Sequence, residues 1–199
     1  MKTVVVDLGL GNLASVLQAL VRAGGDPQLS KDPAAVARAP RVVVPGVAAF
    51  GLGIQRALNF KPSLEEALRR GAPVIGICLG MQILFEEGDE DGLRPGLGLL
   101  PGRVTRLPAS VQVPHIGWQK LQACGDSPLR PSGWAYFAHS YRCEAPAEVT
   151  HAFAEHGAVR IAAVVGRGTL FGVQYHPEKS AHDGEALLRR FLALPEGAA

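Results

Sequence analysis

The sequence predicts an α/β protein with an open, mostly parallel sheet that is flanked by helices and extended by an antiparallel section. Two observations predict this class. In the first half, continuous apolar runs at 42–44 and 74–77 alternate with helix-like segments, which is typical of parallel strands buried on both faces. In the second half, short strand-like pieces are separated by turns rich in Pro and Gly, which indicates antiparallel hairpins added to the sheet.

The elements of the first half follow from local patterns. A β-branched run at 4–6 predicts the first strand. Asn12 is expected to cap the next helix, whose apolar residues recur at helical spacing from Leu13 to Val21. Gly24 and Gly25 are expected to end that helix. The remaining elements expected here are a strand at 42–44 that ends at Pro45, a helix at about 62–70 and a strand at 74–77.

The second half is expected to be richer in strands. They are predicted at about 103–107, 134–138, 149–154, 159–165 and 169–175. A last helix is expected at about 182–194, with an apolar face made by Leu187, Leu188, Phe191 and Leu192. In an open α/β sheet, sites form where the strands reach their carboxyl ends. Gly46, Cys78 and His176 all stand at such ends, so we expect a site there.

Length and composition narrow the class of protein. A chain of 199 residues is expected to form a single domain over 1–199, and 47% apolar residues are ample for a core. A net charge of +2 with scattered Lys and Arg gives no reason to expect a nucleic-acid partner. The N-terminal apolar run is too short for a signal peptide, and no run approaches the length of a membrane span. We therefore expect no membrane partner either.

The cysteines and histidines indicate a reducing compartment and no metal. Three cysteines, an odd number without a CxxC pair, are typical of free thiols rather than of a disulfide framework. The six histidines show no spacing that is typical of metal ligands. We therefore expect a cytoplasmic protein with no metal site and no cofactor.

The most informative feature is Cys78, which stands between the strand at 74–77 and a helix-like run at 81–85. Gly76 and Gly80 flank it, two residues away on either side, which is the sulfur version of the G-x-S-x-G nucleophile elbow. Such a turn strains the backbone at the nucleophile, and side chains at the glycine positions would collide with neighbouring elements. The positive end of the following helix stabilises a thiolate. The alternative is a small core residue, because most lone free cysteines are buried hydrophobes.

His176 and Glu178 lie at the end of the strand predicted at 169–175, where positions two apart face the same side. Pro177 between them favours extended backbone at His176, and it has no N–H to donate to a neighbouring strand. Together with Cys78 they can form a Cys-His-Glu triad, in which the histidine is the base and the carboxylate orients it. Taken alone, a His-Pro-Glu tripeptide is more often a surface turn.

The stretch Gly-Ile-Cys-Leu-Gly-Met-Gln at 76–82, together with His-Pro-Glu at 176–178, resembles the class I (triad) glutamine amidotransferases. Further segments resemble one branch of that family, the glutaminase subunits of imidazole glycerol phosphate synthases. These segments are Gly11-Asn12-Leu13 with Ser15, Pro45-Gly46-Val47 with Ala49-Phe50, Pro114-His115-Ile116-Gly117-Trp118, His139-Ser140-Tyr141 and Lys179-Ser180. The resemblance runs from about Val4 to Phe191 and implies a class I glutamine amidotransferase-like fold.

The resemblance implies an enzyme that hydrolyses glutamine to glutamate and ammonia through a cysteine thioester, in the service of histidine biosynthesis. Cys78 would attack the amide carbon, His176 would move the proton, and Glu178 would orient the imidazole. The N–H of Leu79, the first amide after the nucleophile, would be one donor to the oxyanion. The family takes the second donor from the loop that here reads Gly46-Val47. The positions that match its glutamine-binding residues are Gln82, Ser140 and Tyr141.

The resemblance also implies a partner, a cyclase (synthase) subunit with a (β/α)₈ barrel, which would form a heterodimer with this chain and use the ammonia. The segment 114–118 matches a loop of the family that faces this subunit. The positions expected at the interface are Asn12, Pro114, Ile116, Trp118 and Lys179. Trp118 is expected to be a hot spot for binding the partner, because Trp is enriched among hot-spot residues of protein interfaces. Leu8, Ala48 and Gln119 depart from residues that are common in the family.

Three alternatives remain open from the sequence. The first is a glutaminase subunit of another synthase, one that makes anthranilate, aminodeoxychorismate or pyridoxal phosphate, although the segments at 114–118 and 139–141 argue against it. The second is a non-catalytic scaffold with the same fold, which would tolerate loss of any triad residue. The third is a cysteine protease or thiol hydrolase. Ammonia release from glutamine and co-purification with a barrel partner would separate them.

Overall fold

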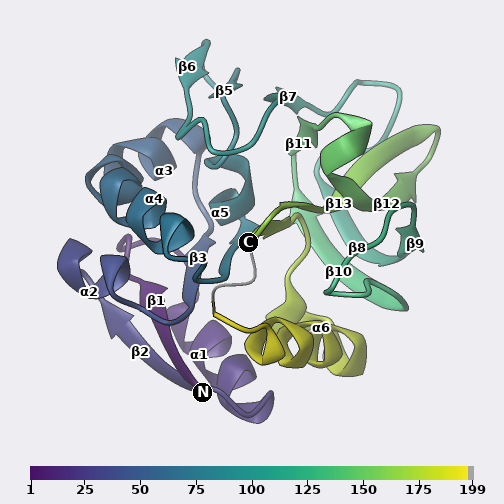
Figure 1. Ribbon diagram of the computed structural model, residues 1–199. Coiled ribbons are helices and arrows are strands. Elements are labelled where there is room, and N and C mark those ends of the chain that lie inside the picture. The colour runs from purple at the N-terminus through teal and green to yellow at the C-terminus, as the bar shows by residue number, and fades with distance from the viewer. Residues whose placement is uncertain (197–199) are drawn as a thin grey trace.

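The computed structural model describes residues 1–196, so the last three residues of the predicted domain, 197–199, lie outside the described residues. Within residues 1–196, eight strands form the main sheet (Figure 1). Their order is β2 (Asp26–Ser30), β1 (Lys2–Val6), β3 (Val42–Gly46), β4 (Val74–Cys78), β14 (Leu170–Val173), β13 (Val159–Arg167), β12 (Thr150–His156) and β9 (Gln122–Ala123). The first five are parallel, and β13, β12 and β9 continue the sheet antiparallel. The predicted fold class is therefore confirmed.

Helices cover both faces of this sheet (Figure 1). One layer is made by α1 (Leu13–Arg22) and α6 (Ala181–Ala193), and the other by α2 (Pro33–Ala37), α3 (Phe50–Ala57) and α4 (Lys61–Arg69). Successive residues of β3 alternate between the layers, because Val43 packs with α1 and α6 while Val42 and Val44 pack with the other helices. Burial on both faces is why the parallel strands read as continuous apolar runs.

The predicted start and end of the first helix are confirmed. The side-chain oxygen of Asn12 accepts a hydrogen bond from the Ser15 N–H at 3.3 Å, and Gly24 takes a φ of +91° just after α1. The sequence patterns did not predict β2, α2, α3 or β9, nor the short strands at 87–88, 94–95 and 141–144. Strand β2 lies at the sheet edge with mostly exposed or half-buried side chains, so it lacks an apolar run. Helix α3 is interrupted by glycines, and Gly53 packs directly against the Leu79 side chain.

The helix after Cys78 is shorter than predicted. The run 81–85 was expected to be helical, but α5 (Leu79–Gln82) ends before Ile83. The carbonyl groups of Ile83, Leu84 and Phe85 instead accept hydrogen bonds from backbone N–H groups at 97–100. These tertiary bonds take the acceptors that a continued helix would need.

Two smaller sheets lie beside the main one. The first pairs β8 (His115–Lys120) with β10 (Trp134–His139), so the expectation of a loop at 114–118 is wrong for all but Pro114. Proline and Gly117, which has a φ of +136°, interrupt the strand pattern in that segment. The second sheet is ordered β11 (Tyr141–Glu144), β7 (Arg103–Arg106), β5 (Glu87–Gly88) and β6 (Arg94–Pro95). The short 3₁₀ helices are η1 (Leu58–Phe60), η2 (Ala147–Val149) and η3 (Pro177–Lys179).

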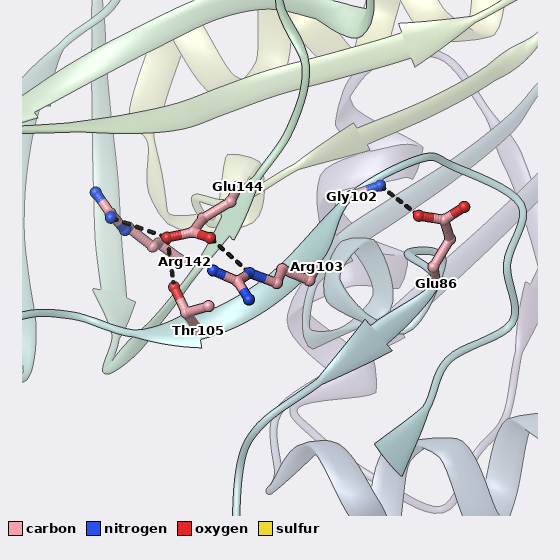
Figure 2. Close-up of polar contacts among 6 residues, drawn as sticks. All are labelled: Glu86, Gly102, Arg103, Thr105, Arg142 and Glu144. Atoms are coloured by element: carbon pink, nitrogen blue, oxygen red, sulfur yellow. Dashed lines mark hydrogen bonds and ion pairs between the residues drawn. The ribbon is translucent and has the colours of Figure 1, made fainter. Parts of the chain in front are cut away.

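A polar cluster fastens β7 to β11, as Figure 2 shows. The Glu144 carboxylate accepts hydrogen bonds from Arg103 at 2.8 Å, from Arg142 at 3.1 Å and from the Thr105 hydroxyl at 3.2 Å. The hydrogen bond from Arg103 is the main reason why the pKa of Glu144 lies below its ordinary value. This cluster holds the far end of β11, the strand that begins at Tyr141.

Over residues 1–196, none of the helices has the length and apolarity to cross a bilayer.

Candidate active site

Cys78 occupies a strained turn between β4 and α5. Its φ of 53° and ψ of −109° lie outside the ordinary regions for a residue with a side chain. A Cβ added at Gly76 would overlap the carbonyl oxygen of Gly80, and a Cβ added at Gly80 would overlap that of Val44. The two glycines therefore allow the close approach of backbone that the elbow needs, as predicted from their spacing.

His176 and Glu178 form a buried pair just after β14. The His176 Nδ1 lies 2.7 Å from Glu178 Oε1, and both side chains are at most 4% exposed. The His176 backbone N–H donates to the Tyr136 carbonyl at 2.9 Å, and its carbonyl accepts from the Ser180 hydroxyl at 2.6 Å. The backbone of His176 is thus held by β10 on one side and by the N-cap of α6 on the other.

The charge state of His176 follows from its neighbours. Burial alone would lower the pKa of His176, but hydrogen bonds and charge interactions with Cys78 and Glu178 raise it to about 9. The imidazole therefore holds a proton at neutral pH, with Cys78 and Glu178 on either side of it. A protonated histidine next to a cysteine in a buried site is typical of an activated thiol.

A cavity of about 290 Å³ opens beside the sulfur of Cys78. The predicted residues that line it are Val47, Cys78, Leu79, Gln82, Pro114, Ile116, Ser140 and Tyr141. They come from the ends of β3 and β4, from α5, from the start of β8, and from the segment where β10 passes into β11. The structure thus brings the predicted nucleophile together with all three positions predicted to bind glutamine.

Two backbone segments can offer donors near Cys78. Leu79 is the first residue of α5, so its N–H has no partner within the helix. Gly46 pairs with Cys78 in the register of β3 and β4, and a Cβ added to Gly46 would lie 3.2 Å from the Leu79 Cβ. Val47 follows at the strand end with its side chain 46% exposed. The donor positions predicted for an oxyanion therefore lie next to Cys78, one at the start of α5 and the other at the end of β3.

The predicted interface residues surround this site. Asn12 and Lys179 line a second, smaller cavity of about 50 Å³, which also contacts His176, Glu178 and Val47. Ile116 and Trp118 point outward from β8 and are 62% and 46% exposed. The Trp118 ring packs edge-on against Tyr136 with centroids 5.9 Å apart. An aromatic, exposed ribbon therefore lies next to the cavity mouth.

Two polar residues that the sequence analysis missed also reach the site. Glu90 lines the 290 Å³ cavity, and its carboxylate accepts a hydrogen bond from the Phe50 N–H at the start of α3. Gln174 is fully buried, and its side-chain N–H₂ lies 3.8 Å from the Cys78 sulfur. The sequence does carry a signal for Gln174, because this polar residue interrupts the apolar run before His176. Glu90 gives no such signal, because it lies in a charged segment.

No metal cluster accompanies the site. Among residues 1–196, no group of three or more His, Cys, Asp or Glu side chains is arranged to hold a metal ion. His115, His139 and His156 do gather near the cavity, but they contact one another and backbone carbonyls.

Comparisons with known proteins agree with this geometry. The family described as Glutamine amidotransferase class-I matches residues 4–194. Imidazole glycerol phosphate synthase subunit HisH of Symbiobacterium thermophilum is 48% identical, over 94% of this chain and 91% of that protein. The same subunit of Halobacterium salinarum is 45% identical, over 95% and 91%, and that of Lactococcus lactis is 38% identical, over 96% and 98%.

Solved structures share the fold at lower identity. A crystal structure described as a glutamine amidotransferase superposes with a TM-score of 0.75 at 22% identity, over 96% of both chains. The structure of PurLQS from Thermotoga maritima gives a TM-score of 0.74 at 21% identity, over 96% of this chain and 97% of that one. At these identities the likeness concerns the fold alone.

Proposed function

The chain belongs to the class I glutamine amidotransferase family, and from that premise we propose how its residues divide the work of releasing ammonia. It is an enzyme that hydrolyses glutamine, and it acts in histidine biosynthesis as the glutaminase subunit of an imidazole glycerol phosphate synthase. Relatives of this kind match nearly its whole length, which favours this synthase over the other synthases, the scaffold and the protease considered above. The observation that carries the assignment of roles is the buried His176–Glu178 pair beside the strained Cys78.

In the proposed first step, the Cys78 sulfur attacks the side-chain amide carbon of glutamine. His176 has taken the thiol proton, and its pKa of about 9 supports this charged form. The imidazolium then protonates the leaving nitrogen, and ammonia departs from a γ-glutamyl thioester. Glu178 accepts from Nδ1–H at 2.7 Å, which orients Nε2 toward the reacting atoms and stabilises the imidazolium.

In the second step, water attacks the thioester with His176 as the base, and glutamate leaves. Both steps pass through a tetrahedral intermediate that bears an oxyanion. We assign Leu79 N–H, at the start of α5, as one donor to it, and the Gly46–Val47 peptide at the end of β3 as the other. Removing one such donor typically costs about 10²–10³ in rate.

The cavity supports recognition of a free amino acid. The Gln82 side-chain nitrogen donates to Tyr141 O at 3.1 Å and to Gln174 Oε1 at 3.3 Å, so its oxygen is the atom left to accept from a ligand. Glu90 supplies a carboxylate at the cavity wall, suited to the α-ammonium group of glutamine. Ser140 and Tyr141 line the same wall, and we assign them to binding the α-amino-acid part of the substrate.

The glutaminase works with a cyclase partner and uses glutamine. We propose that the partner is a (β/α)₈ barrel that seats on the β8–β10 ribbon and on the small cavity beside it. Ile116 and Trp118 on the ribbon, with Asn12 and Lys179 at the cavity, form a partly apolar surface around Val47. Contacts there would reach the proposed oxyanion donor directly. Location in the cytoplasm, lack of a nucleic-acid partner and a single domain over 1–199 stay predictions.

The test is ammonia release from glutamine by the purified complex. Cys78→Ser is expected to abolish it while the partner still binds, and a diazo-ketone analogue of glutamine is expected to label Cys78. Desolvation raises the pKa of the buried Cys143 and, although Cys124 is more exposed, that of Cys124 as well, so these thiols should be spared. Cys124→Ser is the matched control, because Cys124 is an exposed residue just after β9 and does not line the cavity. Labelling of another thiol, with Cys78 unmodified, would refute the assignment of Cys78 as the nucleophile.

A further inference from the structure

Gln174 is a buried polar residue that the mechanism above does not use. It follows directly after β14, its side chain is 0% exposed, and its backbone N–H donates to the Ala163 carbonyl at 3.0 Å. A primary amide in a dry core is costly unless both of its ends are hydrogen-bonded. Its partners therefore indicate what the residue is for.

Both ends of the Gln174 amide have partners. Its Nε2 lies 3.8 Å from the Cys78 sulfur, within the range for a hydrogen bond to sulfur. Its Oε1 lies 3.3 Å from Gln82 Nε2 and 3.9 Å from the Cys143 sulfur. The amide thus links the nucleophile to a residue of the proposed glutamine-binding wall.

The Tyr141 carbonyl sets the direction of these hydrogen bonds. The Tyr141 carbonyl can only accept, so the Gln82 amide must turn its N–H₂ group toward it, at 3.1 Å. The same nitrogen faces Gln174, which must then present its oxygen. The Gln174 N–H₂ is left facing Cys78, so the sulfur receives a donor.

We infer that Gln174 is a positioning residue for the reaction, which donates a hydrogen bond to the Cys78 sulfur and ties it to the substrate wall through Gln82. The inference rests on the proposed function. An amide N–H stabilises a thiolate but cannot remove or carry a proton at neutral pH. Gln174 therefore holds the attacking atom without competing with His176 as a base.

The test uses Gln174→Met, which keeps the side-chain length but has no N–H. Alkylation of Cys78 by iodoacetamide is followed by mass spectrometry of its peptide across pH, in the complex with the partner. We expect the midpoint to move to higher pH, and kcat for glutamine to fall at least about tenfold. KM should change less, within about twofold, because Gln82 keeps its bond to Tyr141 O.

Two further variants separate the roles of the amide. Gln174→Glu keeps an acceptor for Gln82 but lacks the N–H, so it should lose kcat as Gln174→Met does. If Gln174→Glu retains wild-type kcat, the residue serves Gln82 and not the sulfur. Gln174→Asn keeps a buried amide that is too short to reach Cys78, and should show the same alkylation shift if Gln174→Met does not fold.

The matched control is Val173→Ala, at the adjacent fully buried position of β14, which removes packing but no polar group. Urea unfolding of each variant shows whether a loss of rate reflects unfolded protein. Wild-type alkylation and kcat in a folded Gln174→Met would overturn the inference, as would equal losses in Val173→Ala. Alkylation needs no glutamine, so a wild-type enzyme without glutaminase activity would refute the proposed function while still leaving Gln174 tested.

Discussion

The buried imidazoles of His115 and His139 predict that the protein loses stability in mild acid. His139 Nδ1 lies 2.8 Å from the Tyr141 carbonyl, which can only accept, so that nitrogen carries the proton. Its Nε2 must then accept from His115 Nδ1 at 3.0 Å. A second proton on His139 would set two N–H groups against each other, so the hydrogen bonds favour a neutral His139. Burial favours the neutral form of His115.

The magnitude follows from the two shifts. Burial, with a small contribution from His156, lowers the pKa of His115 to about 4, and burial lowers that of His139 to about 3. The ordinary value is 6.5, so the unfolded chain binds more protons below it and stability falls as the pH falls. At about 1.4 kcal/mol per proton and pH unit, the two residues together should cost roughly 3 kcal/mol between pH 6.5 and 5.

The assay is urea unfolding at pH 5.0, 5.5, 6.0 and 6.5 for wild type and His115→Phe. The variant removes one of the two titrations, so its free energy of unfolding should change less steeply with pH than that of wild type. His182→Gln is the control, because the His182 side chain is 89% exposed and its loss should leave the slope unchanged. Equal slopes in wild type and His115→Phe would refute the reasoning, whatever their absolute stabilities.

Three other predictions concern packing, the partner and a surface charge. Gly80→Ala should lower the free energy of unfolding by at least about 3 kcal/mol, because the new Cβ would overlap the backbone of Val44. Trp118→Ala should weaken the complex with the cyclase by about 2 kcal/mol, or roughly thirtyfold in Kd measured by titration. Glu144→Gln should cost about 0.5 kcal/mol at pH 7, because the charge pairs with Arg103 and Arg142. That difference should vanish as the pH falls through the lowered pKa of Glu144.

Each of these has its own control and contrary outcome. Gly168→Ala, with open space around it and a φ of +58°, should cost only about 1 kcal/mol, and a similar loss at both glycines would contradict the overlap argument. Leu58→Ala, at an exposed site on η1, should leave the complex intact. An unchanged Kd for Trp118→Ala would remove that residue from the interface. For Glu144→Gln, an equal difference at pH 7 and pH 3 would show that packing, and not charge, was lost.

Local chemistry made much of the site predictable. The spacing of Gly76 and Gly80 around Cys78 is a backbone requirement, and the structure shows the overlap that any side chain would cause there. The His176–Glu178 pair follows from two positions that share one side of an extended chain. Both features depend on residues close in sequence, so they could be predicted without knowledge of the fold.

The remaining parts depend on contacts between distant segments. The shortness of α5 follows from backbone donors at 97–100, and no pattern within 79–85 predicts them. The segment 114–118 was expected to be a loop because it matches a loop of the family, yet pairing with β10 makes His115–Lys120 a strand. Glu90 and Gln174 reach the site through the tertiary arrangement alone.

Strand β14 is the last strand within residues 1–196, yet it lies in the interior of the main sheet, between β4 and β13. Leu170 pairs with Val74 and Val173 with Ile77, so the centre of the sheet closes only through contacts far apart in sequence. Such contacts slow folding, and until they form, β4 presents an unpaired apolar edge of the kind that promotes aggregation. During synthesis, Cys78 is therefore made well before His176 and Glu178, and the edge of β4 stays unpaired until β14 follows.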